Sequence, residues 1–553
     1  MKFKLLTICL LTVSSLSAQN SSHNFEVSKN LDIFNAIYKM LDLYYVDTLK
    51  ADKQIGEAVN YLLDGLDPYT EYYPEKDTRD LETLTTGKYA GIGALIRYDK
   101  KEDRCIISEP YEGQPAANAG VRAGDIILRI DGKAVNTKGT QAINSYTSDV
   151  SNRLRGDPDT KITLVVKRPE KGEKTFSFMR AAIQLPAVPY YGMVADDIGY
   201  IYLSTFTKDC YQNVEQALNE LKKKGARSLI LDLRGNGGGL AIEAVHIVNL
   251  FVPKGKLILQ MKGKTQSANS SYTTMHEPND LQIPLVVLVN GQSASSSEIT
   301  CGALQDLDRA VVMGERTFGK GLVQQPRQLP YGGLLKLTTS HYYIPSGRCI
   351  QALDYSRRGQ NGEAYRTPDS LTHIFHTANG RKVRDGGGIT PDVTVKGDSL
   401  PNLLSYLRIS DQFFDFATHY HATHPSIGPA ATFSISDDDY KAFKDSLTKS
   451  DFTYDRQTYK ALQELKKIAR FEGYDKSAAT EIQALEKKLQ HNLPGDLETW
   501  KKQIRQLLNA EICGRYYYQR GTLENSLRTD SVLHKAISLL HKPTEYRRIL
   551  SGK

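Results

Sequence analysis

The stretch from Leu285 to Gln324 constrains the fold of this chain more than any other. Its first five residues, LVVLV, form a continuous apolar run, which is typical of a strand buried on both faces of a parallel sheet. A segment of helical character, Glu298 to Leu307, and a second apolar strand, Ala310 to Met313, come later in the stretch. Four serines lie between the first strand and the helix, at Ser293, Ser295, Ser296 and Ser297. This order predicts an α/β layer that carries small nucleophiles on a strand-to-helix turn.

A second buried strand of the same kind lies upstream. The amphipathic segment Asn213 to Lys224 precedes the apolar strand Ser228 to Leu233, which runs into the sequence DLRGNGGG. A further helical segment, Ala241 to Phe251, follows the glycines. Ligands of open α/β sheets bind at the carboxyl ends of the strands. We therefore expect any ligand of this layer to bind at the strand ends, where these turns lie.

A single lysine follows in the glycine-rich turn Gly319-Lys320-Gly321. A serine hydroxyl needs a base, and a lysine amine can serve when burial keeps it neutral. The same turn fits the phosphate-binding pattern GxxxxGK from Gly314 to Lys320, but Gly321 stands where that loop requires Ser or Thr. The residues therefore favour a hydroxyl activated by an amine over a nucleotide site. A base that must be neutral predicts activity that rises toward alkaline pH.

A Ser-His hydrolase is the alternative chemistry for the serine turn. The GxSxG signature of many hydrolases is absent, because the residues GQSAS from Gly291 to Ser295 lack the closing glycine. His246 and His341 can still be brought near a serine by the fold, so the sequence leaves this alternative open.

From residue 87 to 183 short β-rich runs alternate with Gly-Asp and Asp-Gly turns. Three pieces of this segment follow in order: the loop GIGA, the helix start QPAA, and AGDII close to IDG. Together they resemble a PDZ domain. The resemblance implies that backbone N–H groups of the loop formed by Gly91, Ile92, Gly93 and Ala94 bind a terminal carboxylate of the substrate. The neighbouring strand edge would then pair with the extended peptide.

The N-terminus has the layout of a secretory signal peptide. Lys2 and Lys4 precede an apolar run from Leu5 to Val13, and small residues follow as far as Ala18. Residues 1–18 are therefore predicted to be removed, and the chain is predicted to be exported, most simply to the periplasm. No later apolar run reaches the length of a membrane span, so no integral membrane segment is expected after cleavage.

Composition and residue clusters argue against several partners and cofactors. The formal charge of +8 comes with acidic residues spread throughout the chain, so no nucleic-acid partner is expected. Six scattered cysteines without a CxxC pair argue against a disulfide framework or a zinc site. His419, His421 and His424 lack accompanying acidic or thiol ligands. We therefore expect no metal and no cofactor.

The ordered motifs DLRGNGGG, VLVNxxSASxSEI, GALQD and GExTFGKGxVQ are similar to those of the C-terminal processing peptidase family of serine proteases, the tail-specific proteases. The resemblance covers roughly Leu31 to Val395. It implies that Ser295 is the nucleophile, that Lys320 is its base, and that Gln324 orients the lysine.

The resemblance also implies an oxyanion hole made by backbone groups. Its donors would be the N–H of Ser296 and the N–H of a glycine in the upstream turn, Gly238 or Gly239. The family usually has alanine where this chain has Ser296, a departure that leaves the backbone role unaffected. Asp306 of GALQD matches a position to which the family sometimes assigns a supporting role, and we rank it below the other residues.

These observations predict a multidomain α+β protein. Its parts are a signal peptide (1–18), an N-terminal helical region (19–86), a β-rich PDZ domain (87–183), an α/β serine protease core (184–400) and an α-helical C-terminal region (401–553). The expected function is that of an exported serine endopeptidase that recognises protein or peptide substrates by accessible C-termini. A non-catalytic PDZ scaffold is the second alternative. An adaptor protein and a homo-oligomer are left open, and the C-terminal helices carry no motif with assigned chemistry.

Overall fold

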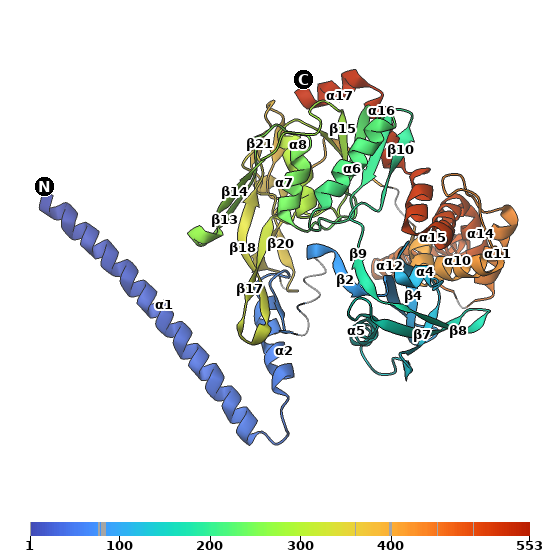
Figure 1. Cartoon of the computed structure of the whole chain (residues 1–553), viewed down its shortest axis with the longest axis horizontal. Coiled ribbons are helices and arrows are strands. Elements are labelled where there is room, and N and C mark those ends of the chain that lie inside the picture. The colour runs from blue at the N-terminus through green and yellow to red at the C-terminus, as the bar shows by residue number, and fades with distance from the viewer. Residues whose placement is uncertain are drawn as a thin grey trace. The chain divides into compact units, whose positions relative to one another are not determined.

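The computed structural model of the chain describes residues 2–75, 78, 85–359, 361–397, 401–450, 452–489 and 492–552 (Figure 1). It divides into two compact units. The first comprises Met1–Glu75 with Pro326–Leu337, and the second comprises Lys76–Gln325 with Thr338–Lys553. The predicted boundary at residue 400 lies outside the described residues.

The first unit begins with two helices, α1 (Lys2–Tyr44) and α2 (Ala51–Asp64). A short strand, β1 (Glu71–Tyr73), pairs antiparallel with the start of β18 (Leu334–Tyr343). Glu71 and Lys336 lie opposite each other in this pair and form an ion pair of 2.6 Å. Among the described residues, no helix combines the length and the apolar character that a bilayer crossing requires.

A six-stranded sheet organises the second unit. Its order is β10 (Tyr190–Ala195), β11 (Ile198–Tyr202), β12 (Ser228–Asp232), β15 (Leu285–Val289), β16 (Val311–Gly314) and β23 (Val393–Thr394). Strand β10 is antiparallel to β11, and the later neighbours are parallel. The connections include helices α6 (Cys210–Lys223), α7 (Ala241–Asn249) and α8 (Ser296–Asp306). Because β12 and β15 are parallel neighbours, the turns that follow them lie at the same edge of the sheet.

Both faces of this sheet are covered by helices. Along β12, Leu229 and Leu231 pack into a core with α6, α7 and α8, whereas Ile230 between them packs into a core on the opposite face. That second core is completed by α16 (Ser531–Leu540) and α17 (Pro543–Ser551), from the end of the chain. The double cover explains why the strands read as continuous apolar runs.

The PDZ-like segment forms its own antiparallel sheet. Its order is β3 (Ala94–Asp99), β4 (Arg104–Pro110), β5 (Ile126–Ile130), β7 (Lys161–Arg168) and β8 (Gly172–Met179), with β6 (Lys133–Ala134) beside β5. Helices α4 (Pro115–Asn118) and α5 (Ile143–Leu154) share its core. A two-stranded ribbon of β2 (Lys88–Gly91) and β9 (Ala181–Gln184) completes this part.

Beyond residue 401 the described chain is helical. One core is shared by α9 (Asn402–Ile409), α10 (Gln412–Thr423), α11 (Asp437–Thr448), α14 (Leu493–Thr499) and α15 (Lys501–Leu527). Helices α12 (Gln457–Phe471) and α13 (Ala479–Lys488) lie between α11 and α14 in the chain. The ring of Phe414 lies between the guanidinium groups of Arg97 and Arg515, each 4.3 Å from its centroid. These contacts tie the helices to the PDZ sheet.

The remaining strands extend the core. Strand β13 (Leu257–Gly263) pairs with β14 (Ser270–Thr273) and with the end of β18. Strand β17 (Leu322–Gln328) follows the lysine turn. Two hairpins, β19 (Leu353–Arg358) with β20 (Ala364–Arg366) and β21 (Ile374–His376) with β22 (Lys382–Arg384), follow β18. The predicted multidomain α+β class, with helical, PDZ-like and α/β parts, is confirmed.

Candidate active site

Three of the four serines hold the glycine turn against the serine turn. The hydroxyl of Ser293 donates to the carbonyl of Leu233 at 2.8 Å, and that of Ser297 donates to the carbonyl of Asn236 at 2.8 Å. The hydroxyl of Ser296 donates to the carbonyl of Gly239, also at 2.8 Å. All three serines are fully buried. Their hydroxyls therefore serve to join the turns after β12 and β15, as the parallel pairing of these strands predicts.

Ser295 differs from these three serines. It is half-buried and stands at the N-cap of α8, with φ 56° and ψ −115°. A positive φ is uncommon outside glycine and marks a backbone that its surroundings must hold in place. The sharp turn therefore presents the Ser295 side chain at the start of a helix, where the dipole and the first-turn N–H groups favour negative charge.

Gly238 lies directly against the serine turn. A Cβ atom built on Gly238 would stand 2.8 Å from Ser295 Cβ and 3.0 Å from the Ser296 nitrogen, so no side chain fits there. The predicted donors Gly238 and Ser296 thus lie beside Ser295, and Gly239 lies against Ser296, whose hydroxyl donates to its carbonyl. The N–H of Gly238, however, donates to Asn236 Oδ1 at 2.9 Å. Gly239 is therefore the better choice of the two glycines for an oxyanion donor.

The glycine turn is also anchored from the end of the chain. Arg234 donates to both carboxylate oxygens of Asp530, at 3.1 and 2.5 Å, and also binds Asp232. Asp530 is the N-cap of α16 and accepts from the N–H groups of Val532 and Leu533. One carboxylate therefore connects the glycine turn to the helix that covers the second face of the sheet.

The lysine turn meets the serine turn through one carboxylate. Glu298 Oε2 accepts from the N–H of Ser295 at 2.8 Å and from the N–H of Lys320 at 2.9 Å. Its Oε1 accepts from the N–H of Gly319 at 2.7 Å and from the hydroxyl of Thr317 at 2.6 Å. Burial raises the pKa of Glu298 to about 7, against the effect of these four donors.

Close packing explains the glycine before the lysine. Gly319 has φ 90°, and a Cβ atom built on it would stand 2.4 Å from Ala352 Cβ. Lys320 itself is half-buried. Strand β17 begins at Leu322, so no helix follows this turn to receive a phosphate, as a nucleotide-binding loop requires. Gln324, on β17, donates its side-chain amide to Thr338 Oγ1 at 3.1 Å.

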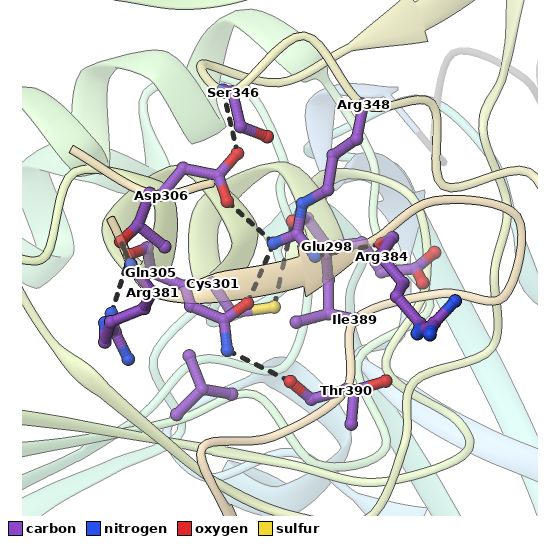
Figure 2. Close-up of polar contacts among 12 residues, drawn as sticks. Glu298, Cys301, Gln305, Asp306, Ser346, Arg348, Arg381, Arg384, Ile389 and Thr390 are labelled. Carbon is purple, nitrogen blue, oxygen red and sulfur yellow. Dashed lines mark hydrogen bonds and ion pairs between the residues drawn. The ribbon is translucent and has the colours of Figure 1, made fainter. Parts of the chain in front are cut away.

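Asp306 lies in a buried network on α8 (Figure 2). Its Oδ1 accepts from Arg348 Nη2 at 2.7 Å, and its Oδ2 accepts from the N–H of Ser346 at 3.0 Å. Arg348 also donates to Gln305 Oε1 at 2.8 Å and to the carbonyl of Arg384 at 3.1 Å. The Asp306 and Arg348 side chains are 0% and 1% exposed. These partners assign Asp306 a structural part in fixing α8.

The two histidines of the alternative chemistry have partners elsewhere. His246 lies on α7, with Nδ1 3.8 Å from Glu243 Oε1 and its ring against Tyr211. His341 lies on β18 opposite Lys262. The described contacts therefore do not link either histidine to Ser295.

The described residues contain no group of three or more His, Cys, Asp and Glu side chains arranged to hold a metal ion. His419 contacts Glu170, and the ring of His424 stacks on Tyr420. Four of the cysteines, Cys105, Cys210, Cys301 and Cys513, are buried as free thiols, and Cys349 is half-buried.

A groove lies beside the predicted carboxylate-binding loop. The loop residues Gly91 and Ile92 are buried, and Gly93 has φ 72°, leading into β3 at Ala94. Strand β3 is one of the two edge strands of the PDZ sheet. Between β3 and α5 lies a cavity of about 650 Å³, lined among others by Tyr89, Ala94, Ile96, Thr147, Ser148 and Arg155. An edge strand beside an open cavity is the geometry that strand addition by a peptide requires.

Sequence reasoning did not single out Glu298, Tyr342 or Asp530. The spacing of Ser295 and Glu298 is that of a capping box, S-x-x-E, and this signal could have located Glu298. Tyr342, on β18, donates its hydroxyl to the carbonyl of Lys320 at 2.8 Å. No local pattern points to Tyr342, because its partners are distant in the chain, whereas Asp530 could have been located as an N-cap before the apolar segment of α16.

Comparison with known proteins finds matches for three parts of the chain. The family "Peptidase family S41" matches residues 197–355, and "PDZ domain" matches residues 106–168. "Probable PDZ-protease, C-terminal helical domain" matches residues 403–540.

Similar proteins with curated descriptions include a "Probable CtpA-like serine protease" of Staphylococcus aureus, 35% identical over 324 residues. That match covers 58% of this chain and 62% of the relative, so this chain spans less than two thirds of that protein. A "Carboxy-terminal-processing protease" of Bartonella bacilliformis is 33% identical over 349 residues, which cover 62% of this chain and 77% of the relative. Among solved structures, the photosystem II D1 C-terminal processing protease is 28% identical with a TM-score of 0.36, covering 66% of this chain and 86% of that chain.

Proposed function

Because the chain belongs to peptidase family S41, the carboxy-terminal-processing proteases, we propose that it is a serine endopeptidase in which Ser295 is the nucleophile and Lys320 is the base. Ser295 Oγ attacks the scissile carbonyl and passes its proton to the neutral Lys320 amine. The protonated lysine then gives the proton to the leaving amine. Water hydrolyses the acyl-enzyme by the same proton route and restores the serine.

One observation carries the choice of nucleophile. The hydroxyls of Ser293, Ser296 and Ser297 are buried and donate to carbonyls of the glycine turn. Ser295 is the half-buried serine of the four, and it stands at a helix N-terminus with a positive φ. Negative charge that develops on the substrate oxygen is stabilised by such backbone donors. We assign this part to the N–H groups of Ser296 and Gly239, with Gln324 orienting the lysine.

The test of the dyad is a cleavage assay with matched serine variants. Purified protein is expected to degrade an unstructured substrate with an apolar C-terminus, and Ser295→Ala and Lys320→Ala are each expected to abolish cleavage. Ser297→Ala is the control: it removes a neighbouring hydroxyl that joins the turns through the carbonyl of Asn236, so it should lower cleavage without abolishing it. Cleavage that persists in Lys320→Ala but fails in His246→Ala would favour the Ser-His chemistry instead.

We further propose that the groove between β3 and α5 binds the C-terminal tail of the substrate. The loop from Gly91 through Ile92 and Gly93 to Ala94 would receive the carboxylate, and the edge of β3 would pair with the peptide. The observation that supports this is the cavity beside an edge strand.

The groove is tested by filling it. Ser148 is exposed and lines the cavity, so Ser148→Trp should block the tail without disturbing the core. Ser145→Trp is the matched control, because Ser145 is exposed on the same helix and lies outside the lining. Ser145→Trp should bind a peptide with a free C-terminal carboxylate but not the C-terminal amide of the same peptide. Ser148→Trp should bind neither peptide. A scaffold without peptidase activity would bind the free acid and leave the substrate intact.

Export belongs to the same proposal. Residues 1–18 have the charge and apolar layout of a signal peptide, and a periplasmic enzyme would meet unfolded tails there. Cell fractionation with N-terminal sequencing of the mature protein tests this: an intact N-terminus in the cytosolic fraction would contradict it.

A further inference from the structure

Two buried side chains bind the backbone of both Ser295 and Lys320. The Glu298 carboxylate accepts from the N–H of each residue, at 2.8 and 2.9 Å through the same oxygen. The Tyr342 hydroxyl donates its single proton to the carbonyl of Lys320 at 2.8 Å, and the carbonyl of Ser295, 3.2 Å away, is the weaker acceptor of the same proton. The N–H and the C=O of both residues are thus held by the same pair of side chains.

These two side chains come from separate elements and are shielded from water. Glu298 lies on α8 and Tyr342 on β18, and they are 0% and 1% exposed. Hydrogen bonds in such a water-free setting are electrostatically strong, and leaving one unmade is costly. Rotation of either turn away from the other would break one of the two contacts at Glu298 Oε2 and one of the two at the Tyr342 hydroxyl.

The Ser295 backbone needs such a constraint. Its φ of 56° and ψ of −115° are unfavourable for a residue with a side chain. A strained conformation persists only where the surrounding structure over-determines it. Glu298 and Tyr342 supply bonds on both sides of the Ser295 peptide unit, and the same two groups extend the constraint to Lys320.

We propose that Glu298 and Tyr342 form a latch that positions the nucleophile relative to its base. This inference rests on the proposed roles of Ser295 and Lys320. Neither Glu298 nor Tyr342 needs to contact the substrate, so both are positioning residues and not catalytic ones. A misplacement of about 1 Å between reacting groups can lower a rate by on the order of 10²-fold.

The experiment uses conservative changes in the full chain. Tyr342→Phe removes one hydroxyl and keeps the ring, and Glu298→Gln keeps the shape but replaces one acceptor oxygen with an NH₂ donor. Tyr440→Phe is the matched control, because Tyr440 is equally buried and its hydroxyl donates to the carbonyl of Leu497 in the helical region. Tyr342→Phe and Tyr440→Phe each lose one buried hydroxyl, so their melting midpoints should fall by similar amounts, whereas Glu298→Gln is compared through its kcat and its amide exchange.

A latch predicts effects that a purely structural hydrogen bond does not. The kcat of Tyr342→Phe and Glu298→Gln should fall by about 10–100-fold with little change in KM, while Tyr440→Phe keeps the kcat of the unchanged protein. Because both side chains act on one geometry, the double variant should cost less than the product of the two single effects. Wild-type kcat in both latch variants would overturn the proposal.

Hydrogen exchange separates failure of the latch from failure of the proposed chemistry. Amide exchange in peptides covering 290–300 and 315–323 should speed up in both latch variants, and not in Tyr440→Phe. Unchanged exchange in these peptides would overturn the latch whatever the activity. Cleavage that persists in Ser295→Ala would overturn the proposed nucleophile but leave the exchange result to decide the latch.

Discussion

Removing the carboxylate of Asp306 is predicted to destabilise the core without touching the chemistry. The Asp306→Ala variant leaves the Arg348 guanidinium, 1% exposed, without its charge partner. Breaking a buried ion pair from one side costs about 3–5 kcal/mol, because an uncompensated charge stays in a water-free site. The N–H of Ser346 also loses its acceptor, Asp306 Oδ2, so the upper half of this range is expected.

The predicted effect is large enough to measure by calorimetry. For a domain of about 150–250 residues, 1 kcal/mol shifts the melting midpoint by about 2–4 °C, so a loss of about 4–5 kcal/mol should move the core transition down by about 8–20 °C. The chain has several domains, and the midpoint of the transition is therefore compared in place of a single unfolding free energy. Below the lowered midpoint, kcat per folded molecule should equal that of the unchanged protein.

Two further variants decide the cause. Asp306→Leu combined with Arg348→Met replaces the pair by apolar side chains and should recover most of the lost midpoint. Glu57→Ala removes an exposed ion pair with Lys53, 3.8 Å apart, and should leave the midpoint unchanged. The reasoning is refuted if Asp306→Ala loses kcat at an unchanged midpoint, because Asp306 would then act in the chemistry.

Two shorter predictions concern other carboxylates, those of Glu298 and Asp530. Burial raises the pKa of Glu298 to about 7, and its four donors suit the ionised form, so activity should rise with pH through about 7, and Glu298→Gln should lack this limb. The stability that the protonated carboxyl contributes is present below about pH 4.5 and is lost as pH rises through about 7. Over this range the unfolding free energy of the unchanged protein should therefore fall by about 3 kcal/mol relative to that of Glu298→Gln. Burial raises the pKa values of Tyr342 and Cys301, which face Glu298, so both groups stay protonated throughout. Asp530→Ala should lower the melting midpoint more than Asp530→Asn, because asparagine keeps the helix cap, worth about 1 kcal/mol; equal losses would mean that the contact with Arg234 dominates.

The sequence predicted the layers, whereas the meeting of the glycine turn and the serine turn came from the structure. Continuous apolar runs predicted buried parallel strands, and the parallel pairing of β12 with β15 brings the glycine and serine turns together. The choice of Ser295 among the four serines came from a family motif. Composition could not make it, since the three other hydroxyls are distinguished only by carbonyl partners some 60 residues away in the chain.

The finer features of the site depend on backbone orientation, which sequence does not report. Gly238 and Gly239 were equivalent candidates for an oxyanion donor, because a glycine run can turn its peptide planes in many ways. In the structure the N–H of Gly238 turns toward Asn236 Oδ1. Tyr342 was invisible for a related reason: its role arises from the pairing of β18 with β13, and no local spacing encodes it.

The apolar strands of the α/β sheet explain what the C-terminal helices do. A strand that is apolar at every position needs a cover on both faces, yet α6, α7 and α8 all pack on one face of the sheet. Among the described residues up to 397, no helix of this layer packs on Ile230, Val286 and Leu288, which lie on the other face. Helices α16 and α17 supply that cover, and full burial of an aliphatic side chain contributes about 1.5–3 kcal/mol. Because the N-cap of α16, Asp530, also binds Arg234 of the glycine turn, the last helices stabilise the sheet and fix one edge of the candidate active site together.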